Sequence, residues 1–113
     1  MRNLLAALVF LVLTGCASSF EEQRADGPTE VFTSAKPVDQ VSRCVFFNWQ
    51  KYTWYGSPLS VLIQPNEHGG STVSAGQSDF FVDVTAKGYR TRIDYYGSGM
   101  IGKELQPLVK SCL

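Results

Sequence analysis

Residues 80–96 read FFVDVTAKGYRTRIDYY, and this stretch decides the fold of the 113-residue chain. Its first half places an apolar side chain at every second position from Phe80 to Val84, which is the pattern of a β-strand with one buried face. The same alternation returns after Lys87-Gly88, whose composition is typical of a hairpin turn. The stretch therefore predicts two antiparallel strands whose apolar sides lie in the core.

The register of this hairpin follows from its side-chain pairs. We predict that Val82 faces Ile93 on the core side, because apolar pairs stabilise neighbouring strands. Asp83 then faces Arg92 on the outer side. The outer face carries charged side chains with two aromatic ones among them: Asp79, Asp83, Arg90, Arg92, Asp94, Phe81 and Tyr96. We expect ion pairs on a solvated face, and the alternative is a group of carboxylates for acid–base chemistry or calcium.

The rest of the chain adds helices and strands around the hairpin. Residues 38–52 carry apolar side chains at helical spacing and predict the main helix. Further strands are expected at residues 30–34, 60–64 and 71–75. A short C-terminal helix over residues 105–112 begins no earlier than about Glu104, because Pro107 is tolerated only in a first turn. The order predicts an α+β two-layer sandwich, with the helices on one face of an antiparallel sheet of about four to five strands.

The N-terminus has the order of features of an export signal. Arg2 supplies a positive charge, residues 4–13 are mostly apolar, and Gly15 is a small residue at the cleavage position. The apolar run is too short to span a bilayer as a mature helix. We therefore assign residues 1–15 to a signal peptide.

The segment Leu13-Thr14-Gly15-Cys16 also resembles the lipobox of bacterial lipoproteins. The resemblance implies that the Cys16 thiol receives a diacylglyceryl group, that the signal is cut before it, and that the new N-terminus is acylated. It also implies the outer membrane as the destination, because Ala17 is not the Asp that retains many lipoproteins in the inner membrane. We expect residues 16–29 to be the lipidated cysteine and a flexible tether, and residues 30–113 to form one domain facing the periplasm.

Two cysteines remain once Cys16 is lipidated. Cys44 and Cys112 then lie in an oxidising compartment, where an isolated pair is expected to form a disulfide. The alternatives are two buried thiols or a metal site, but two cysteines and one distant histidine fall short of the four ligands of structural zinc. We predict no metal, and no cofactor other than the covalent lipid on Cys16.

Charge and composition argue against several classes of function. Lys and Arg total 10, and Asp and Glu total 10, so the chain offers no basic stripe for nucleic acid. It has no polybasic tract for an anionic membrane surface, so membrane attachment must come from the lipid. His68 is the one histidine, and its glycine-rich loop is a poor platform for catalysis. We expect a solvated loop residue there rather than a catalytic or metal-binding one, and we predict no catalytic residue.

Aromatic residues are concentrated in residues 46–55, at the end of the main helix and in the turn after it. Most should fill the core of so small a domain, and the alternative is a recognition surface. Phe47 falls among the polar residues of the helix, so either the C-terminal segment covers it or it is exposed for a partner. Phe47, Phe81 and Tyr96 are the predicted interaction surface.

The layout from about Phe32 to Leu113 resembles small, single-domain lipoproteins of Gram-negative bacteria that largely lack an assigned activity. The matching features are Val41-Ser42-Arg43-Cys44, Asp79-Phe80-Phe81-Val82-Asp83-Val84 and Ser111-Cys112-Leu113. The resemblance transfers no catalytic residues. Our leading hypothesis is a lipid-anchored, non-enzymatic module that binds an envelope protein or glycan or assists assembly. The alternatives are a small periplasmic hydrolase or wall-modifying enzyme, and a lysozyme- or toxin-inhibiting lipoprotein.

Overall fold

The computed structural model describes residues 19–113, so the predicted signal peptide and Cys16 lie outside the described residues. The elements in chain order are α2 (Ser19–Asp26), β1 (Glu30–Ser34), α3 (Val38–Lys51), β2 (Thr53–Trp54), β3 (Ser57–Pro58), β4 (Val61–Pro65), β5 (Ser71–Ala75), β6 (Phe80–Lys87), β7 (Arg90–Tyr96) and α4 (Gly99–Lys110). The predicted α+β class is confirmed. The main helix and the strands lie where the side-chain spacing places them.

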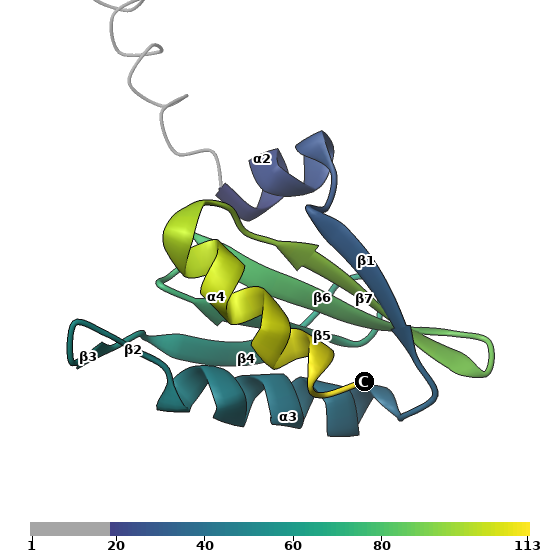
Figure 1. Cartoon of the computed structure of the whole chain (residues 1–113). Coiled ribbons are helices and arrows are strands. Elements are labelled where there is room, and N and C mark those ends of the chain that lie inside the picture. The colour runs from purple at the N-terminus through teal and green to yellow at the C-terminus, as the bar shows by residue number, and fades with distance from the viewer. Residues whose placement is uncertain (1–18) are drawn as a thin grey trace, which may run out of the picture.

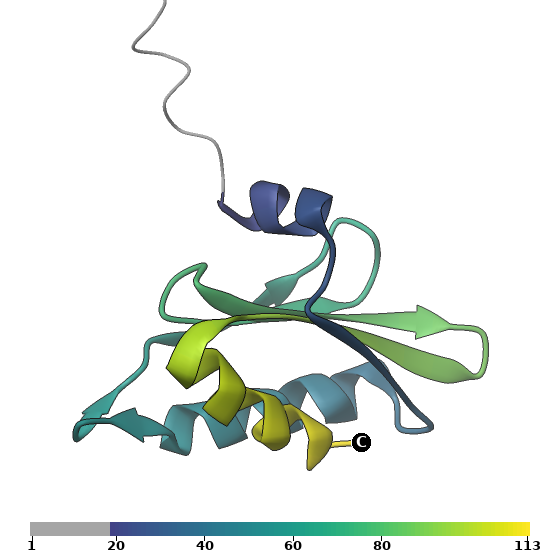
Figure 2. The same ribbon diagram turned by 45° about the horizontal axis from the view of Figure 1, so that its top comes forward.

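The five long strands form one antiparallel sheet in the order β1-β7-β6-β5-β4. Helices α3 and α4 lie on one face of this sheet and α2 lies on the other, as Figures 1 and 2 show. Strands β2 and β3 form a separate ribbon after α3. Its turn residues Tyr55 and Gly56 have φ angles of 49° and 79°, as a type I′ hairpin requires. Residues 30–113 thus form the predicted two-layer sandwich, and α2 adds a helix on the other face of its sheet.

The main core lies between the sheet and the pair α3 and α4. Val41, Val45 and Trp49 recur at helical spacing along α3 and are completely buried. They pack with the inward side chains of the strands and of α4: Phe32, Val73, Ala75, Val82, Val84, Ile93, Tyr95, Leu105 and Val109. Each large apolar side chain buried in this way contributes about 1.5–3 kcal/mol. The apolar residues at helical spacing in α3 are therefore the ones that contact the sheet.

The turn between β6 and β7 lies one residue later than the composition suggested. Lys87 faces Arg90, which leaves Gly88 and Tyr89 as a two-residue turn. Gly88 has a φ of 60°, and a positive φ at the first turn position matches the twist of antiparallel strands. Glycine takes this conformation without strain, so its position fixes the turn.

The predicted hairpin register is wrong by two residues as a result. Ile93 faces Val84, two residues from its predicted partner. Because side chains alternate with a period of two, each one keeps its predicted face. On the outer face, however, Asp83 faces Asp94 instead of Arg92. Two carboxylates are therefore directly opposed where we expected an ion pair.

Helix α4 begins at Gly99, about five residues before its predicted start. The prediction failed because Pro107 lies inside the helix, although it cannot donate a hydrogen bond there. Contacts with the end of β7 offset this loss. The Tyr95 hydroxyl donates to the Gly102 carbonyl oxygen. The backbones of Gly97 and Gly102 also lie so close that a Cβ at Gly102 would be 3.0 Å from the carbonyl carbon of Gly97. The first turns of α4 are held by this close approach.

Ser19–Asp26 form helix α2 instead of part of the flexible tether that we expected. Glu21 and Glu22 lie in the first turn, where negative charge favours a helix. Phe20 and Arg24, one helical turn apart, both contact the sheet. These two contacts order a segment that has no apolar stripe of its own. The folded part of the chain therefore begins before residue 30.

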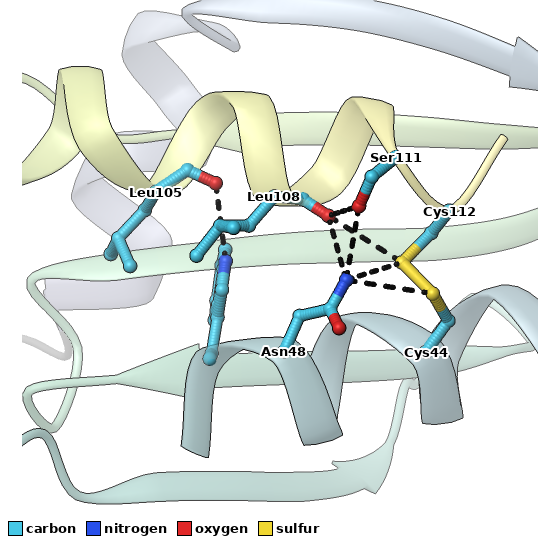
Figure 3. The surroundings of a disulfide bond; sticks show 7 residues. Cys44, Asn48, Leu105, Leu108, Ser111 and Cys112 are labelled. Atoms are coloured by element: carbon cyan, nitrogen blue, oxygen red, sulfur yellow. Dashed lines mark hydrogen bonds between the residues drawn. A yellow bond between two sulfur atoms is a disulfide. The ribbon is translucent and has the colours of Figure 1, made fainter. Parts of the chain in front are cut away.

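The predicted disulfide between Cys44 and Cys112 is confirmed, with a Cα–Cα distance of 5.7 Å. It joins α3 to Cys112, two residues after the end of α4, as Figure 3 shows. Asn48 lies one turn after Cys44, and its side-chain amide donates to the Leu108 carbonyl oxygen at 3.2 Å and to the Ser111 hydroxyl at 3.0 Å. The bridge and this amide fasten the C-terminus along one flank of α3.

Replacing both bridging cysteines by serine should lower the free energy of unfolding by about 4 kcal/mol, because the bridge closes a long loop in the unfolded chain. Urea unfolding followed by circular dichroism measures this change. Wild-type protein in a reductant should lose the same amount. An unchanged midpoint in both experiments would contradict the structural role of the bridge.

Tyr95 is a completely buried ionisable group in the core. Its hydroxyl bonds to Gly102, and its ring meets the Trp49 ring edge-on with centroids 6.4 Å apart. Burial raises the pKa of Tyr95 from 10.0 to about 12. The folded protein therefore favours the neutral phenol more strongly than the unfolded chain does.

Because the unfolded chain loses this proton first, the contribution of Tyr95 to stability should be complete below pH 10 and should fall as the pH rises to about 12. Urea unfolding at a series of alkaline pH values measures the slope. Tyr95→Phe should flatten it, whereas Tyr89→Phe, at a fully exposed tyrosine, should not. The same slope in Tyr95→Phe and wild type would assign the loss to other groups.

Candidate functional site

Helix α2 covers an aromatic group on the outer face of the sheet. The rings of Phe81 and Tyr96 are stacked with centroids 4.4 Å apart, and Phe20 meets Phe81 edge-on at 4.8 Å. Phe81 is completely buried, and Tyr96 is 6% exposed. The expectation that these two residues form an interaction surface is therefore wrong for the folded chain, because α2 occupies that face.

Asp83 lies among these groups and is the charged centre of the contact between α2 and the sheet. Arg24 Nε donates to Oδ2 and Arg24 Nη2 donates to Oδ1, each at 2.9 Å. Oδ1 also accepts from the Thr72 hydroxyl at 2.7 Å and from the Asn66 amide at 3.0 Å. We refer to Arg24, Asn66, Thr72 and Asp83 as the Asp83 cluster. A bidentate arginine and two further donors compensate a buried carboxylate for the loss of its hydration.

The Asp83 cluster draws its residues from four segments of the chain. Thr72 faces Asp83 in the register of β5 and β6. Asn66 begins the loop after β4, where its Oδ1 accepts from the backbone N–H of His68 at 2.9 Å, as in an Asx turn. Arg24 comes from α2, and its hydrogen bond to Asp83 raises the pKa of the guanidinium. The cluster therefore ties the N-terminal helix to the middle of the sheet.

The opposed carboxylate, Asp94, has a separate cation. Arg92 lies two residues before it on β7, and its Nε donates to Asp94 Oδ1 at 2.8 Å. This pair is more open to solvent than the pair of Arg24 and Asp83. Burial raises the pKa of the neighbouring Tyr96, and the carboxylates of Asp94 and Asp83 raise it further. Each carboxylate of the opposed pair is therefore neutralised by its own arginine.

Two hollows adjoin the Asp83 cluster, with volumes of about 210 and 240 Å³. Asn66 and His68 line both of them. The first also reaches Asp83, Arg92 and Asp94. His68 is exposed, and within residues 19–113 its imidazole makes no hydrogen bond. The structure thus places His68 on the same hollow as Asp83 and Asp94, which we had not expected from its loop.

The chemistry available in these hollows is restricted by the bonds that their groups already make. Asp83 accepts four hydrogen bonds, so a role as a base would require the loss of its arginine. Asp79 lies in the turn before β6 and does not line the hollow that Asp83 and Asp94 share, so the three aspartates do not form one carboxylate group. Within the described residues, no three His, Cys, Asp or Glu side chains are arranged to hold a metal ion.

Phe47 is the predicted surface residue that stays accessible, with 49% of its surface exposed. Its ring meets the ring of Phe46 edge-on at 5.4 Å, and Phe46 packs against the core. The C-terminal segment follows the flank of α3 marked by Cys44 and Asn48 and leaves Phe47 open. Of the two expectations for Phe47, exposure is the one observed.

The sequence reasoning missed Arg24, Asn66 and Thr72. Arg24 lies in the segment that we expected to be flexible. Phe20, one helical turn earlier, was the one feature of the sequence that could have indicated a docked helix there. Thr72 faces Asp83 through strand register, and Asn66 reaches it from a loop. Neither contact leaves a pattern in the local sequence.

No helix among residues 19–113 is long and apolar enough to cross a membrane. Comparison with protein-family models, with curated proteins and with solved structures found no match.

Arg24 and Asp83 should be coupled by about 1–2 kcal/mol in a double-mutant cycle, because a partly buried charged pair is lost when either side chain is removed. The cycle uses Arg24→Ala, Asp83→Ala and the double variant, with unfolding free energies measured in urea. The matched control is the more exposed pair, Arg92→Ala and Asp94→Ala, for which we expect less than about 1 kcal/mol. Equal coupling in the two cycles would mean that the Asp83 pair does not hold α2.

Proposed function

We propose that this chain is a lipid-anchored, non-enzymatic module of the bacterial cell envelope that binds a partner protein or glycan or assists assembly. The observation that carries the proposal is a spacing. Residues 17 and 18 alone separate the lipobox cysteine, Cys16, from the first residue of the docked helix α2.

This spacing gives the anchor a short reach. Three residue steps from Cys16 to Ser19 span at most about 11 Å. Because Phe20 and Arg24 dock α2 on the sheet, an acylated Cys16 would hold the domain close to the membrane surface. The face under α2 would then lie toward the lipid, and α3 and α4 would lie away from it (Figure 2). The outer surface of α3 is the part of the domain best placed to meet a partner in the periplasm.

Phe47 supplies the binding feature on that surface. It is a half-exposed aromatic side chain, and such side chains are common anchors of protein interfaces. Arg43 and Lys51 are exposed one helical turn before and after it, so that two cations flank the ring. This combination suits a partner that presents an apolar group beside carboxylates.

The bonding of the polar groups supports a binding role over catalysis. Asp83 is engaged by four donors, and the His68 imidazole faces solvent without a partner among the described residues. Hydrolysis by a nucleophilic side chain needs a base and a third group that orients the base. The bonds of Asp83 and His68 within residues 19–113 do not form that arrangement.

Cross-linking in intact cells, followed by affinity isolation of the full-length protein and mass spectrometry, tests the proposal. We expect one envelope component to be recovered with the wild type. Phe47→Ala should reduce its recovery by about tenfold or more, because truncating an interface anchor costs at least about 1–2 kcal/mol. Tyr89→Ala, at an exposed aromatic residue on the hairpin turn, should leave recovery unchanged.

Cys16→Ser separates the anchor from the binding surface. The Cys16→Ser chain should fold with the same unfolding midpoint, but it should be neither lipidated nor cut at residue 16. A processed Cys16→Ser chain retained in the membrane would overturn the anchor. Isolation of the wild type without any envelope component would overturn the partner.

A further inference from the structure

Strand β4 is an exposed edge of the sheet with no charged residue. Its sequence is Val-Leu-Ile-Gln-Pro, and four of its five residues are exposed. Leu62 is 57% exposed on the outer face, and Ile63 is 41% exposed on the face toward α3. Natural edge strands usually carry charged side chains that prevent pairing with another sheet, and β4 has only the terminal Pro65 in this role.

The opposite edge, β1, is protected by contrast. Its first residue, Glu30, is charged, and its carboxylate accepts from the side-chain amide of Gln106 on α4. Lys110 of the same helix lies over the Phe32 ring at 5.8 Å. Helix α4 therefore places a cation and an amide over β1, so the unprotected edge is β4.

The backbone groups that β4 leaves free can be assigned from its pairing with β5. Gly76 N–H donates to the Ser60 carbonyl at 3.0 Å, and Asn66 N–H donates to the Gly70 carbonyl at 3.1 Å. Hydrogen-bonded positions alternate along an antiparallel strand, so even-numbered residues of β4 bond to β5. Val61, Ile63 and Pro65 therefore direct their backbone groups outward, with two N–H donors and three carbonyl acceptors.

We propose that β4 pairs with β4 of a second copy of this chain, antiparallel and centred on Ile63. In that register Ile63 N–H donates to the partner's Ile63 carbonyl oxygen, and Val61 N–H donates to the partner's Pro65 carbonyl oxygen. Both donors of each copy are satisfied, and the missing N–H of Pro65 leaves no donor unpaired. All five residues of the strand overlap, and the two five-stranded sheets become continuous.

Charge and side chains also fit a second copy. Leu62 faces the partner's Gln64 in this register, so no like charges are opposed, and the formal net charge of the chain is +0. A hollow of about 270 Å³ beside the edge, between Phe20 and Leu62, has room for a side chain from the other strand. The paired strands are short, so we expect a weak dimer.

The symmetry agrees with two anchored copies. Antiparallel pairing within one continuous sheet is related by a twofold axis perpendicular to the sheet, so both α2 helices lie on the same side. Two chains held by Cys16 lipids in one membrane could therefore pair, and confinement to that surface would raise their effective concentration. This last step rests on the proposed anchor, whereas the pairing itself does not.

Sedimentation of the full-length protein in mild detergent tests the pairing. The wild type should reach twice the protomer mass as its concentration rises. Ile63→Lys should remain a monomer, because it opposes two lysines at the twofold axis. Val31→Lys on the other edge, at a residue of similar exposure (44%), should dimerise like the wild type. A wild type that stays monomeric, or an Ile63→Lys chain that still dimerises, would overturn the proposal.

Ile63→Cys in intact membranes provides a second readout. Without a reductant it should give a covalent product of twice the chain mass, and Val31→Cys should not. A product of any other mass would assign the edge to a different protein and overturn self-pairing, as would the absence of any product. Cys16→Ser carrying Ile63→Cys separates this result from the anchor, because a concentrated unlipidated chain should still form the product.

Discussion

Two carboxylates directly opposed across β6 and β7 set a constraint on the rest of the structure. The turn at Gly88 places Asp83 opposite Asp94, and like charges in this position destabilise neighbouring strands. Asp94 is neutralised by Arg92 from its own strand, whereas Asp83 depends on Arg24, which lies 59 residues earlier. Docking of α2 therefore supplies the missing cation to the sheet. The same helix covers Phe81, so charge and apolar burial order one segment together.

The parts of the fold that could be predicted are those in which the spacing of apolar side chains shows which side of an element is buried. Val41, Val45 and Trp49 recur at helical spacing because one side of α3 faces the sheet. The hairpin register could not be predicted, since Lys87-Gly88 and Gly88-Tyr89 are both acceptable turns by composition, and the twist of the strands decides between them. Helix α2 has a single large apolar residue, and the contacts that order it come from strands far along the chain.

Some features of the candidate site could likewise be predicted from the sequence, and others could not. Cys44 and Cys112 could be paired because the predicted lipidation of Cys16 leaves two cysteines, which an oxidising compartment would be expected to join. Alternation placed Phe81 and Tyr96 correctly on the outer face, but their burial could not be predicted without α2. Phe47 stood out because it interrupts the polar side of its helix, and it is exposed. A local pattern thus gives the face on which a residue lies, whereas its exposure depends on what else packs there.

The bridge between Cys44 and Cys112 makes residues 44–112 a closed covalent ring. Tension between the N-terminus and a partner on α3 can extend only the chain before this ring. From Ser19 to Cys44 that chain reaches at most about 90 Å, and β1 must leave the sheet before the limit is approached. Mechanical load would peel away α2 and one edge strand, while most of the core stays inside the ring. The disulfide thus acts as a stop that limits how far a pulled domain can lengthen.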